Sequence, residues 1–189
     1  AGWKPQQMID GISGIMSLAA ASGEDLGTTS DIVTDALTAF GLQAGDAGHF
    51  ADVLAQASAN ANTNVSMLGE SFKYVAPVAG AMNYSVEDTS LALGLMANAS
   101  IKGSMAGTAL KTSLANMAAP TDSMAAAMDK YGISLTDSEG NMKSLRGVID
   151  NLRGSLGGLS ETEQTAAAST IFGKEAMAGM LAIINASEE

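Results

Sequence analysis

Residues 46–120 read DAGHFADVLAQASANANTNVSMLGESFKYVAPVAGAMNYSVEDTSLALGLMANASIKGSMAGTALKTSLANMAAP and form the most regularly patterned part of the chain. Apolar residues recur there at helical spacing in two sets, which are Phe50, Val53, Leu54, Ala57 and Ala61, then Val65, Leu68, Phe72 and Val75. The polar turn Asn62-Thr63-Asn64 separates these sets and offers a side-chain cap for the second. The segment therefore predicts two helices that pair as a hairpin.

The following part of this segment predicts two more helices. Ser85, with Asp88 three positions later, resembles a capping box and indicates a helix start. Residues 91–99 are apolar in every direction around the helix, which predicts a helix surrounded by others. Gly103 is expected to end it and Ser104 to cap the next helix. Gly107, with small residues around it, is expected to let that next helix approach a neighbour closely.

Towards the N-terminus, two further apolar stripes predict helices. Met8, Ile12, Ile15, Met16 and Ala19 fall on one helical face, and Ser22-Gly23 is the stop signal. The second stripe follows the polar run Thr28-Thr29-Ser30 and consists of Ile32, Val33, Ala36, Leu37 and Phe40. Gly41 supplies a left-handed exit from this helix.

Beyond Pro120 the pattern continues with shorter elements. A short helix is marked by Met124, Met128 and Tyr131, and a later helical face by Leu145, Val148, Ile149, Leu152 and Leu156. Ser160 and Glu163 form a capping box for another helix. We therefore predict an all-α fold of about ten short helices, with one small β-hairpin near residues 133–143 around a turn-rich stretch. We expect a helical core over residues 1–120 and a C-terminal helical subdomain, with the hairpin, over residues 121–189.

Composition narrows the function classes. The 189 residues carry a net charge of −11 and no cysteine, so we expect neither thiolate chemistry nor stable nucleic-acid binding, which needs clustered Lys and Arg. Apolar runs stop short of the roughly 20 residues that a membrane span needs. The chain begins with Ala1, so we interpret it as a piece of a longer protein.

No residue pattern indicates catalysis, a cofactor or a metal, and we expect no enzyme. His49 is the only histidine, and residues 137–141 lack the spacing of a calcium loop. Glu70 and Glu87 are better explained as solvated helix faces than as the acid pair of a cell-wall hydrolase. GSMAG at 103–107 lacks the lysine of a phosphate-binding loop. Trp3 either packs on the first helix or contacts sequence outside this chain.

The sequence is rich in glycine and in flexible methionine, and poor in aromatic residues. The chain has 21 glycines, 12 methionines and only 4% aromatic residues. Most methionines are expected in the core, although methionine also suits adaptable partner-binding surfaces. Because glycine in a helix costs about 1 kcal/mol relative to alanine, we expect weak internal stability and apolar faces that pack on partners.

Residues 46–120 resemble the core region of bacteriophage tail tape measure proteins, with their pattern VLAxASAxAxTxVxxLGESFKYVAPVA followed by LxLGLxAxAGIKGSxAGTAL. The resemblance extends to three flanking segments, which are GWKPQQMIDGISGIMSLAAASG at 2–23, YGISLTDSEGNMKSL at 131–145 and IFGKEAMAGMLAIINA at 171–186. It implies a structural module that acts in tail assembly, tail length determination and DNA ejection. It supplies no catalytic, cofactor-binding or metal-binding residue.

The resemblance also implies partners and a location. The expected partners are other copies of the tape measure chain and the tail tube and tail tip proteins, with transient host membrane contact during infection. The expected location is the tail lumen of the virion, and the host cytoplasm during assembly. Two alternatives stay open: part of a cell-wall-degrading tail protein, or a membrane-active channel in which segments 8–21 and 176–184 insert into a bilayer for DNA passage.

Overall fold

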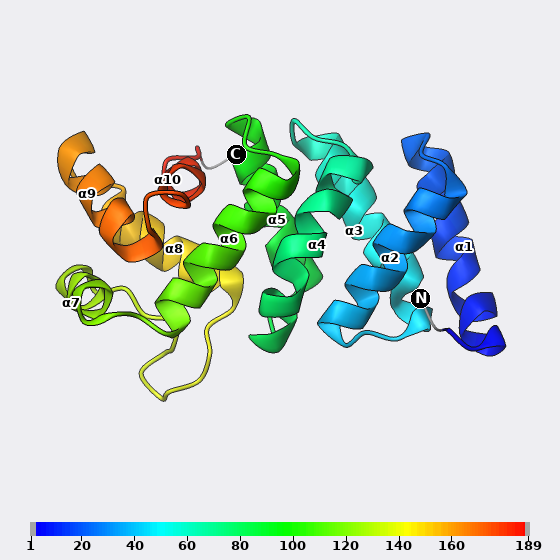
Figure 1. Cartoon of the computed structure of the whole chain (residues 1–189), viewed down its shortest axis with the longest axis horizontal. Coiled ribbons are helices and arrows are strands. Elements are labelled where there is room, and N and C mark those ends of the chain that lie inside the picture. The colour runs from blue at the N-terminus through cyan, green and yellow to red at the C-terminus, as the bar shows by residue number, and fades with distance from the viewer. Residues whose placement is uncertain (1–2, 188–189) are drawn as a thin grey trace. The chain divides into compact units, whose positions relative to one another are not determined.

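The computed structural model describes residues 3–187, and that range contains ten α-helices, one short 3-10 helix and no β-strand (Figure 1). The α-helices are α1 (Pro5–Ser22), α2 (Leu26–Phe40), α3 (Ala47–Asn60), α4 (Val65–Ala81), α5 (Val86–Asn98), α6 (Gly103–Ala118), α7 (Asp122–Tyr131), α8 (Leu145–Leu156), α9 (Glu161–Phe172) and α10 (Met177–Ile184). The 3-10 helix η1 (Ala44–Asp46) precedes α3. The all-α prediction is confirmed.

The chain forms two compact units, residues 3–107 and residues 108–187, which divide within α6. We call them the N-terminal unit and the C-terminal unit. The expected domains 1–120 and 121–189 stay a prediction, because compact packing does not test whether either part folds by itself.

Helices of the N-terminal unit pack mainly on the next helix but one. α1 makes its most extensive contacts with α3, α2 makes its own with α4, and α3 also packs on α5. Successive helices α3 and α4 touch each other less, so the expected pairing of these two as a hairpin is not the main contact of either. Phe72 on α4 lies edge-on to Phe40 and Phe50, at ring-centroid distances of 5.8 Å and 5.6 Å.

Glycines allow several of these helices to approach backbone to backbone. A Cβ atom added to Gly14 of α1 would lie 2.6 Å from the Gly48 nitrogen of α3, and one on Gly80 of α4 would lie 2.2 Å from the Ala39 oxygen of α2. A Cβ on Gly107 would lie 2.2 Å from the Ser71 oxygen of α4. The predicted close approach at Gly107 is confirmed, and its neighbour is α4.

Helix α8 contributes a row of buried side chains to the core of the C-terminal unit. Its apolar face is buried as predicted, with Leu145, Val148, Ile149, Leu152 and Leu156 each at most 2% exposed. Helix α10 packs on both α8 and α9, and α9 also packs on α7. The core of this unit therefore consists mainly of branched aliphatic side chains together with Phe172.

Side-chain caps define most of the predicted helix starts. Asn64, Ser85 and Ser160 accept hydrogen bonds from backbone amides in the first turns of α4, α5 and α9, and Glu163 completes the capping box at α9. Helix α2 begins earlier than expected, because Asp25 caps it by accepting from the Thr28 amide. The polar run 28–30 therefore lies inside the helix.

The boundary between α5 and α6 also differs from the expectation. Helix α5 ends at Asn98, and Ser100 turns the chain with a left-handed φ of 67°. The Ile101 amide donates to the Met96 carbonyl, which closes the helix end as a Schellman-type turn. Gly103 begins α6 instead of ending α5, and Ser104 lies in its first turn.

The small β-hairpin expected near residues 133–143 is wrong. This segment is a loop with one isolated antiparallel bridge between Thr136 and Met142. The Asp137 carboxylate accepts from the Glu139 and Asn141 amides, which closes the turn locally. Ser134 and Lys143 bind the Asn151 side chain of α8. Residues on both sides of the turn therefore bind α8, and they do not form a β-ladder with each other.

Candidate functional site

His49 pairs with a carboxylate on another helix. Its Nε2 atom lies 2.5 Å from the Glu87 Oε1 atom, and this pair joins α3 to the first turn of α5. Partial burial acts to raise the pKa of Glu87, but hydrogen bonds from its own amide and from His49 and the charge of His49 together lower it. Both side chains are about half exposed. The pair is therefore a surface ion pair, which has a small effect on stability.

Glu70 has a basic partner within its own helix. Its Oε2 atom lies 3.1 Å from the Lys73 Nζ atom, one turn away on α4. Glu70 and Glu87 are therefore each engaged by a different basic residue. Over residues 3–187, no group of three or more His, Cys, Asp or Glu side chains is arranged to hold a metal ion.

The carboxylate of Asp137 serves the loop that contains it. Its pKa is lowered, first by the hydrogen bond from the Asn141 amide and then by those from Glu139, the Asn141 side chain and Gly140. A carboxylate used in this way stabilises a turn.

The GSMAG segment at 103–107 makes helix contacts. The Ser71 hydroxyl donates to the Gly103 carbonyl at 2.7 Å, and Gly107 lies against the Ser71 backbone. Close helix packing, the preferred interpretation of this segment, is therefore confirmed.

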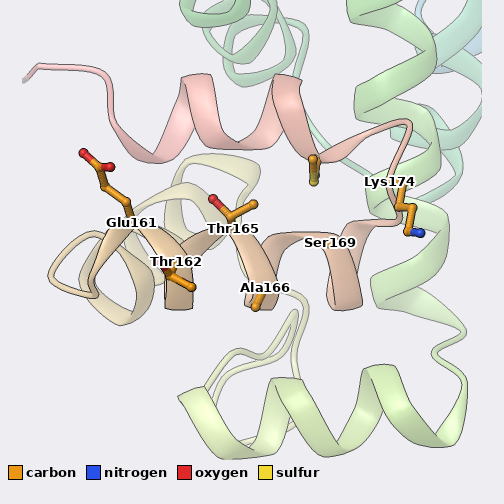
Figure 2. Close-up of a pocket in the computed structure, with 7 residues that line it drawn as sticks. Glu161, Thr162, Thr165, Ala166, Ser169 and Lys174 are labelled. Atoms are coloured by element: carbon orange, nitrogen blue, oxygen red, sulfur yellow. The ribbon is translucent and has the colours of Figure 1, made fainter.

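Open grooves on the surface of the described chain include the following two. One, of about 650 Å³, runs between α9 and the start of α10 and is lined by Glu161, Thr162, Thr165, Ala166, Ser169, Lys174 and Met177. Figure 2 shows Glu161 at one end of α9 and Lys174 beyond its other end, with hydroxyl side chains between them. The other, of about 370 Å³, lies between α2 and α4 beside Phe72 and Lys73. Neither contains a convergent set of buried polar groups that would define a ligand.

The most distinctive surface is an apolar face on α1. Met8 is 55% exposed, Ile9 67%, Ile12 44% and Met16 55%. With 3.6 residues per turn, these four side chains lie within an arc of about 100° on the helix. Met8, Ile12 and Met16 of the predicted apolar stripe are therefore exposed, whereas Ile15 of the same stripe is buried. We call Met8, Ile9, Ile12 and Met16 the α1 apolar face.

The glycines of α1 explain which side of this helix is buried. Its buried residues are Gly11, Gly14, Ile15 and Leu18. Gly14 brings α1 close to the backbone of α3, and Gly11 lies under the Trp3 ring, whose Cζ3 atom would be 2.5 Å from an added Cβ. The side of α1 that carries the glycines therefore faces α3, and the side that carries Met8 and Met16 is exposed. Trp3 thus packs on the first helix, and the 11–14–18 spacing of small residues and leucine was the available sequence signal.

Methionines are more exposed than expected. Of the twelve, only Met96, Met117, Met128 and Met180 are buried, whereas Met8, Met16, Met67, Met105 and Met142 are exposed. The expectation that most lie in the core is wrong. The alternative expectation, an adaptable partner-binding surface, is consistent with these five positions.

Tyr84 is the one buried group with a strongly shifted pKa among the described residues. Burial raises the pKa of its phenol to about 12, and its hydroxyl has no hydrogen-bond partner within residues 3–187. It lies between α4 and α5, where it serves the hydrophobic core.

The two segments of the membrane alternative differ in exposure. Segment 8–21 carries the α1 apolar face, whereas Met180, Ile183 and Ile184 of α10 are each at most 4% exposed. None of the described helices combines the length and the apolarity required to cross a bilayer.

Comparison with known proteins places these features in context. The profile of the family described as "Phage-related minor tail protein" matches residues 1–173. The "Tape measure protein" of Pneumococcus phage Dp-1 is 42% identical over 189 residues, which cover 100% of this chain and 16% of that protein. The "Probable tape measure protein" of Escherichia phage P2 is 26% identical over 174 residues, which cover 91% of this chain and 21% of that protein. No solved structure matches the chain.

These matches confirm the resemblance to a tape measure region that residues 46–120 and their flanks indicated. The chain spans about a fifth or less of the length of these curated relatives.

Proposed function

The chain belongs to the phage-related minor tail protein family, and on that premise we propose that it is a structural module of a tail tape measure protein, and that the parent protein acts in tail assembly, tail length determination and DNA ejection. The observation that carries this proposal is the match to the tape measure protein of phage Dp-1 over the whole chain. It is supported by an all-helical fold among the described residues.

This segment is poorly suited to setting the length of the tail within the parent protein. An extended helix converts sequence into length at about 1.5 Å per residue. Here the longest helix, α1, has 18 residues, and helices of the N-terminal unit pack on one another. Folding back in this way loses most of the axial rise. We therefore assign length measurement to helical parts of the parent protein and assembly or ejection to this segment.

The proposed partners are other copies of the chain and the tail tube and tail tip proteins, and the proposed location is the tail lumen. The net charge of −11 supports a module that repels DNA phosphates instead of binding them, which suits a lumen through which DNA passes. The proposed role requires no catalysis.

The two alternatives have less support. Bilayer insertion would require α10 to leave the core of the C-terminal unit, where its apolar residues are buried. Cell-wall hydrolysis would require an acid-base pair, and both Glu70 and Glu87 have basic partners. Liposome leakage and a zymogram on cell-wall substrate would discriminate these alternatives.

The test compares three changes in the parent phage by electron microscopy and plaque assay. An in-frame deletion in the long helical remainder should shorten tails by about 1.5 Å per residue. A Gly107→Leu substitution leaves length in sequence unchanged but forces a side chain into the Ser71 backbone, and it should block assembly or infection. Gly154→Ala, at a position with open space, is the matched control. If Gly107→Leu phages, checked for loss of the helix contact, produce normal and infectious tails, the proposal fails.

A further inference from the structure

We propose that the α1 apolar face is covered by a helix of the same polypeptide, which precedes residue 1 in the proposed parent protein. In the parent, α1 is then an inner helix of a longer stack. This inference rests on the proposed function for the existence of a longer parent chain. It names the surface through which this segment is joined to the rest of that chain.

The helices α1 to α5 form a stack in which helices two positions apart in the chain pack on each other. Helix α3 has such a neighbour on both sides, because it packs on α1 and on α5. Within residues 3–187, α1 has one such neighbour, α3, and it lies at the outer edge of this unit (Figure 1). The packing order of the stack therefore leaves a place beside α1 for a further helix.

The α1 apolar face lies on the side of α1 where that further helix belongs. Gly14 marks the opposite side, because it faces the α3 backbone at Gly48. With 3.6 residues per turn, the four residues of the face lie about 120° to 160° round the helix from Gly14. The face is thus turned away from α3. Its side chains are 44% to 67% exposed, so nothing within residues 3–187 covers it.

A separate side of α1 is suited to water. Gln6, Asp10, Ser13 and Ser17 are all exposed, and they lie between the apolar face and the buried side of the helix. A stack of helices can end in water only when the outer side of its last helix is polar. The side of α1 that faces away from α3 is apolar instead, and large exposed apolar patches mark interaction sites. Helix α1 therefore has the surface of an inner helix.

Symmetry, charge and area all favour a helix of the same chain over a second copy. The face is not symmetric about Ile12, because Ile9 is exposed whereas Ile15 is buried, and a two-fold contact needs a self-complementary patch. Two copies also repel each other, because each has a net charge of −11. Four side chains make a small contact for separate molecules. A tethered helix needs less area, because the connection gives it a high effective concentration.

A lipid surface fits this face less well. Helices that lie in a bilayer interface are rich in Lys and Arg on their polar face, and anionic lipids attract such residues. The polar side of α1 has Asp10 and no basic residue. Lipid binding is therefore an outcome that the experiment must separate from coverage by a helix.

The lengths of the relatives leave room for such a helix. The matched regions make up 16% of the tape measure protein of phage Dp-1 and 21% of that of phage P2, so most of each relative lies outside the match. If the packing order continues upstream, the covering helix is the second one before α1. Two helices of average length with their connections take about 40 residues.

Thiol labelling tests the assignment, because this chain contains no cysteine. Ile12→Cys is compared in the 189-residue chain and in a chain extended upstream by about 40 residues of the parent. The thiol should react with a maleimide about tenfold more slowly in the extended chain, because it reacts only when the covering helix opens. Ser17→Cys, on the polar side of the same helix, is the matched control and should react equally fast in both chains. Peptide mass spectrometry locates the label.

Thermal unfolding gives an independent readout. Ile12→Asp places a charge in the proposed contact, so it should lower the Tm of the extended chain by about 5 °C. In the 189-residue chain the same position is exposed, and the Tm should change by about 1 °C or less. Ser17→Asp should shift the Tm of both chains equally. Circular dichroism confirms that the variants are folded at the labelling temperature.

Three outcomes would overturn the inference. Equal labelling of Ile12→Cys in the two chains would mean that no upstream helix covers the face. Slower labelling of the 189-residue chain at higher protein concentration would assign the face to a second copy. Slower labelling of that chain only in the presence of phosphatidylcholine–phosphatidylglycerol vesicles would assign it to a lipid surface. These measurements use purified protein, so their failure is distinct from normal tails in the Gly107→Leu test of the proposed function.

Discussion

Helices of the N-terminal unit meet at glycines, whereas helices of the C-terminal unit are joined by side chains that reach across to backbone atoms. Gly14, Gly80 and Gly107 each place a neighbouring backbone where a Cβ atom would clash. In the C-terminal unit, Asn116 donates to the Phe172 carbonyl and Arg153 to the Ile183 carbonyl. The first unit should therefore be sensitive to added volume and the second to lost polar groups.

The largest expected effect tests this sensitivity to volume. Gly80→Ala should lower the free energy of unfolding of the N-terminal unit by about 3 kcal/mol, because the new Cβ would meet backbone that cannot move aside. Urea unfolding followed by the fluorescence of Trp3, the only tryptophan, reports on this unit. Circular dichroism in parallel reports on both units.

Gly154→Ala is the matched control for that substitution. Gly154 lies in α8 with nothing within 4 Å of an added Cβ, so alanine should stabilise the C-terminal unit by about 0.5–1 kcal/mol through helix propensity. If Gly80→Ala and Gly154→Ala lowered the free energy of unfolding equally, the N-terminal unit would not be more sensitive to added volume than the C-terminal unit.

The next effect tests the polar contacts. The Gln164 amide donates to the Leu156 carbonyl and exchanges hydrogen bonds with Asn185. Gln164→Ala leaves the buried Leu156 carbonyl unpaired and removes the partner of the Asn185 side chain. It should cost about 2 kcal/mol, measured by circular dichroism, with the Trp3 transition unchanged. Thr165→Ala, at the next and exposed position of α9, should have little effect. A shift of the Trp3 transition by Gln164→Ala would contradict independent units.

A smaller effect concerns the backbone between α5 and α6. Ser100 adopts a left-handed φ of 67°, and the tape measure pattern has glycine at this position. Ser100→Gly should raise the free energy of unfolding by about 1 kcal/mol because it removes the strain of Cβ in this conformation. Ser100→Ala retains the Cβ atom and should give no such gain. Asn83, at φ 58°, should gain less from glycine, since asparagine tolerates the left-handed region.

The smallest effect is a pH dependence at the capping box of α9. Hydrogen bonds from the Ser160 hydroxyl and amide lower the pKa of Glu163 below its ordinary 4.5. The unfolded chain therefore binds this proton more readily, and the stabilisation is present above about pH 4.5 and lost as the pH falls. The difference in Tm between the native chain and Glu163→Gln should shrink from pH 7 to pH 3. A constant difference over that range would contradict this assignment.

Local chemistry explains which structural predictions succeeded. Asn64, Ser85 and Ser160 cap helices as expected, because a cap needs only a side-chain oxygen and an amide within three residues. Asp25 was not predicted to cap α2, although it accepts from the amide of Thr28 three positions later, the same spacing as in the other caps. The hairpin prediction near 133–143 failed because Asp137 and Asn151 take up the groups that a ladder would need.

The candidate site was harder to predict. The spacing of Met8, Ile12 and Met16 predicted an apolar stripe on α1 correctly, but not that it would stay exposed. Hydrophobic periodicity assumes that the bulkiest stripe is buried. Gly11 and Gly14 lie on the competing stripe, and their advantage exists only when a partner backbone is close enough to use it.

The sequence by itself therefore determined the helical class, most helix starts and the relationship to phage tail proteins, because periodicity, caps and long family patterns are properties of residues near one another in the chain. Only the tertiary structure decided which face of α1 is buried, which helices are neighbours, and that Gly107 meets α4. The physical reason is that close packing depends on the shapes of two surfaces together. One helix cannot specify that fit without its partner.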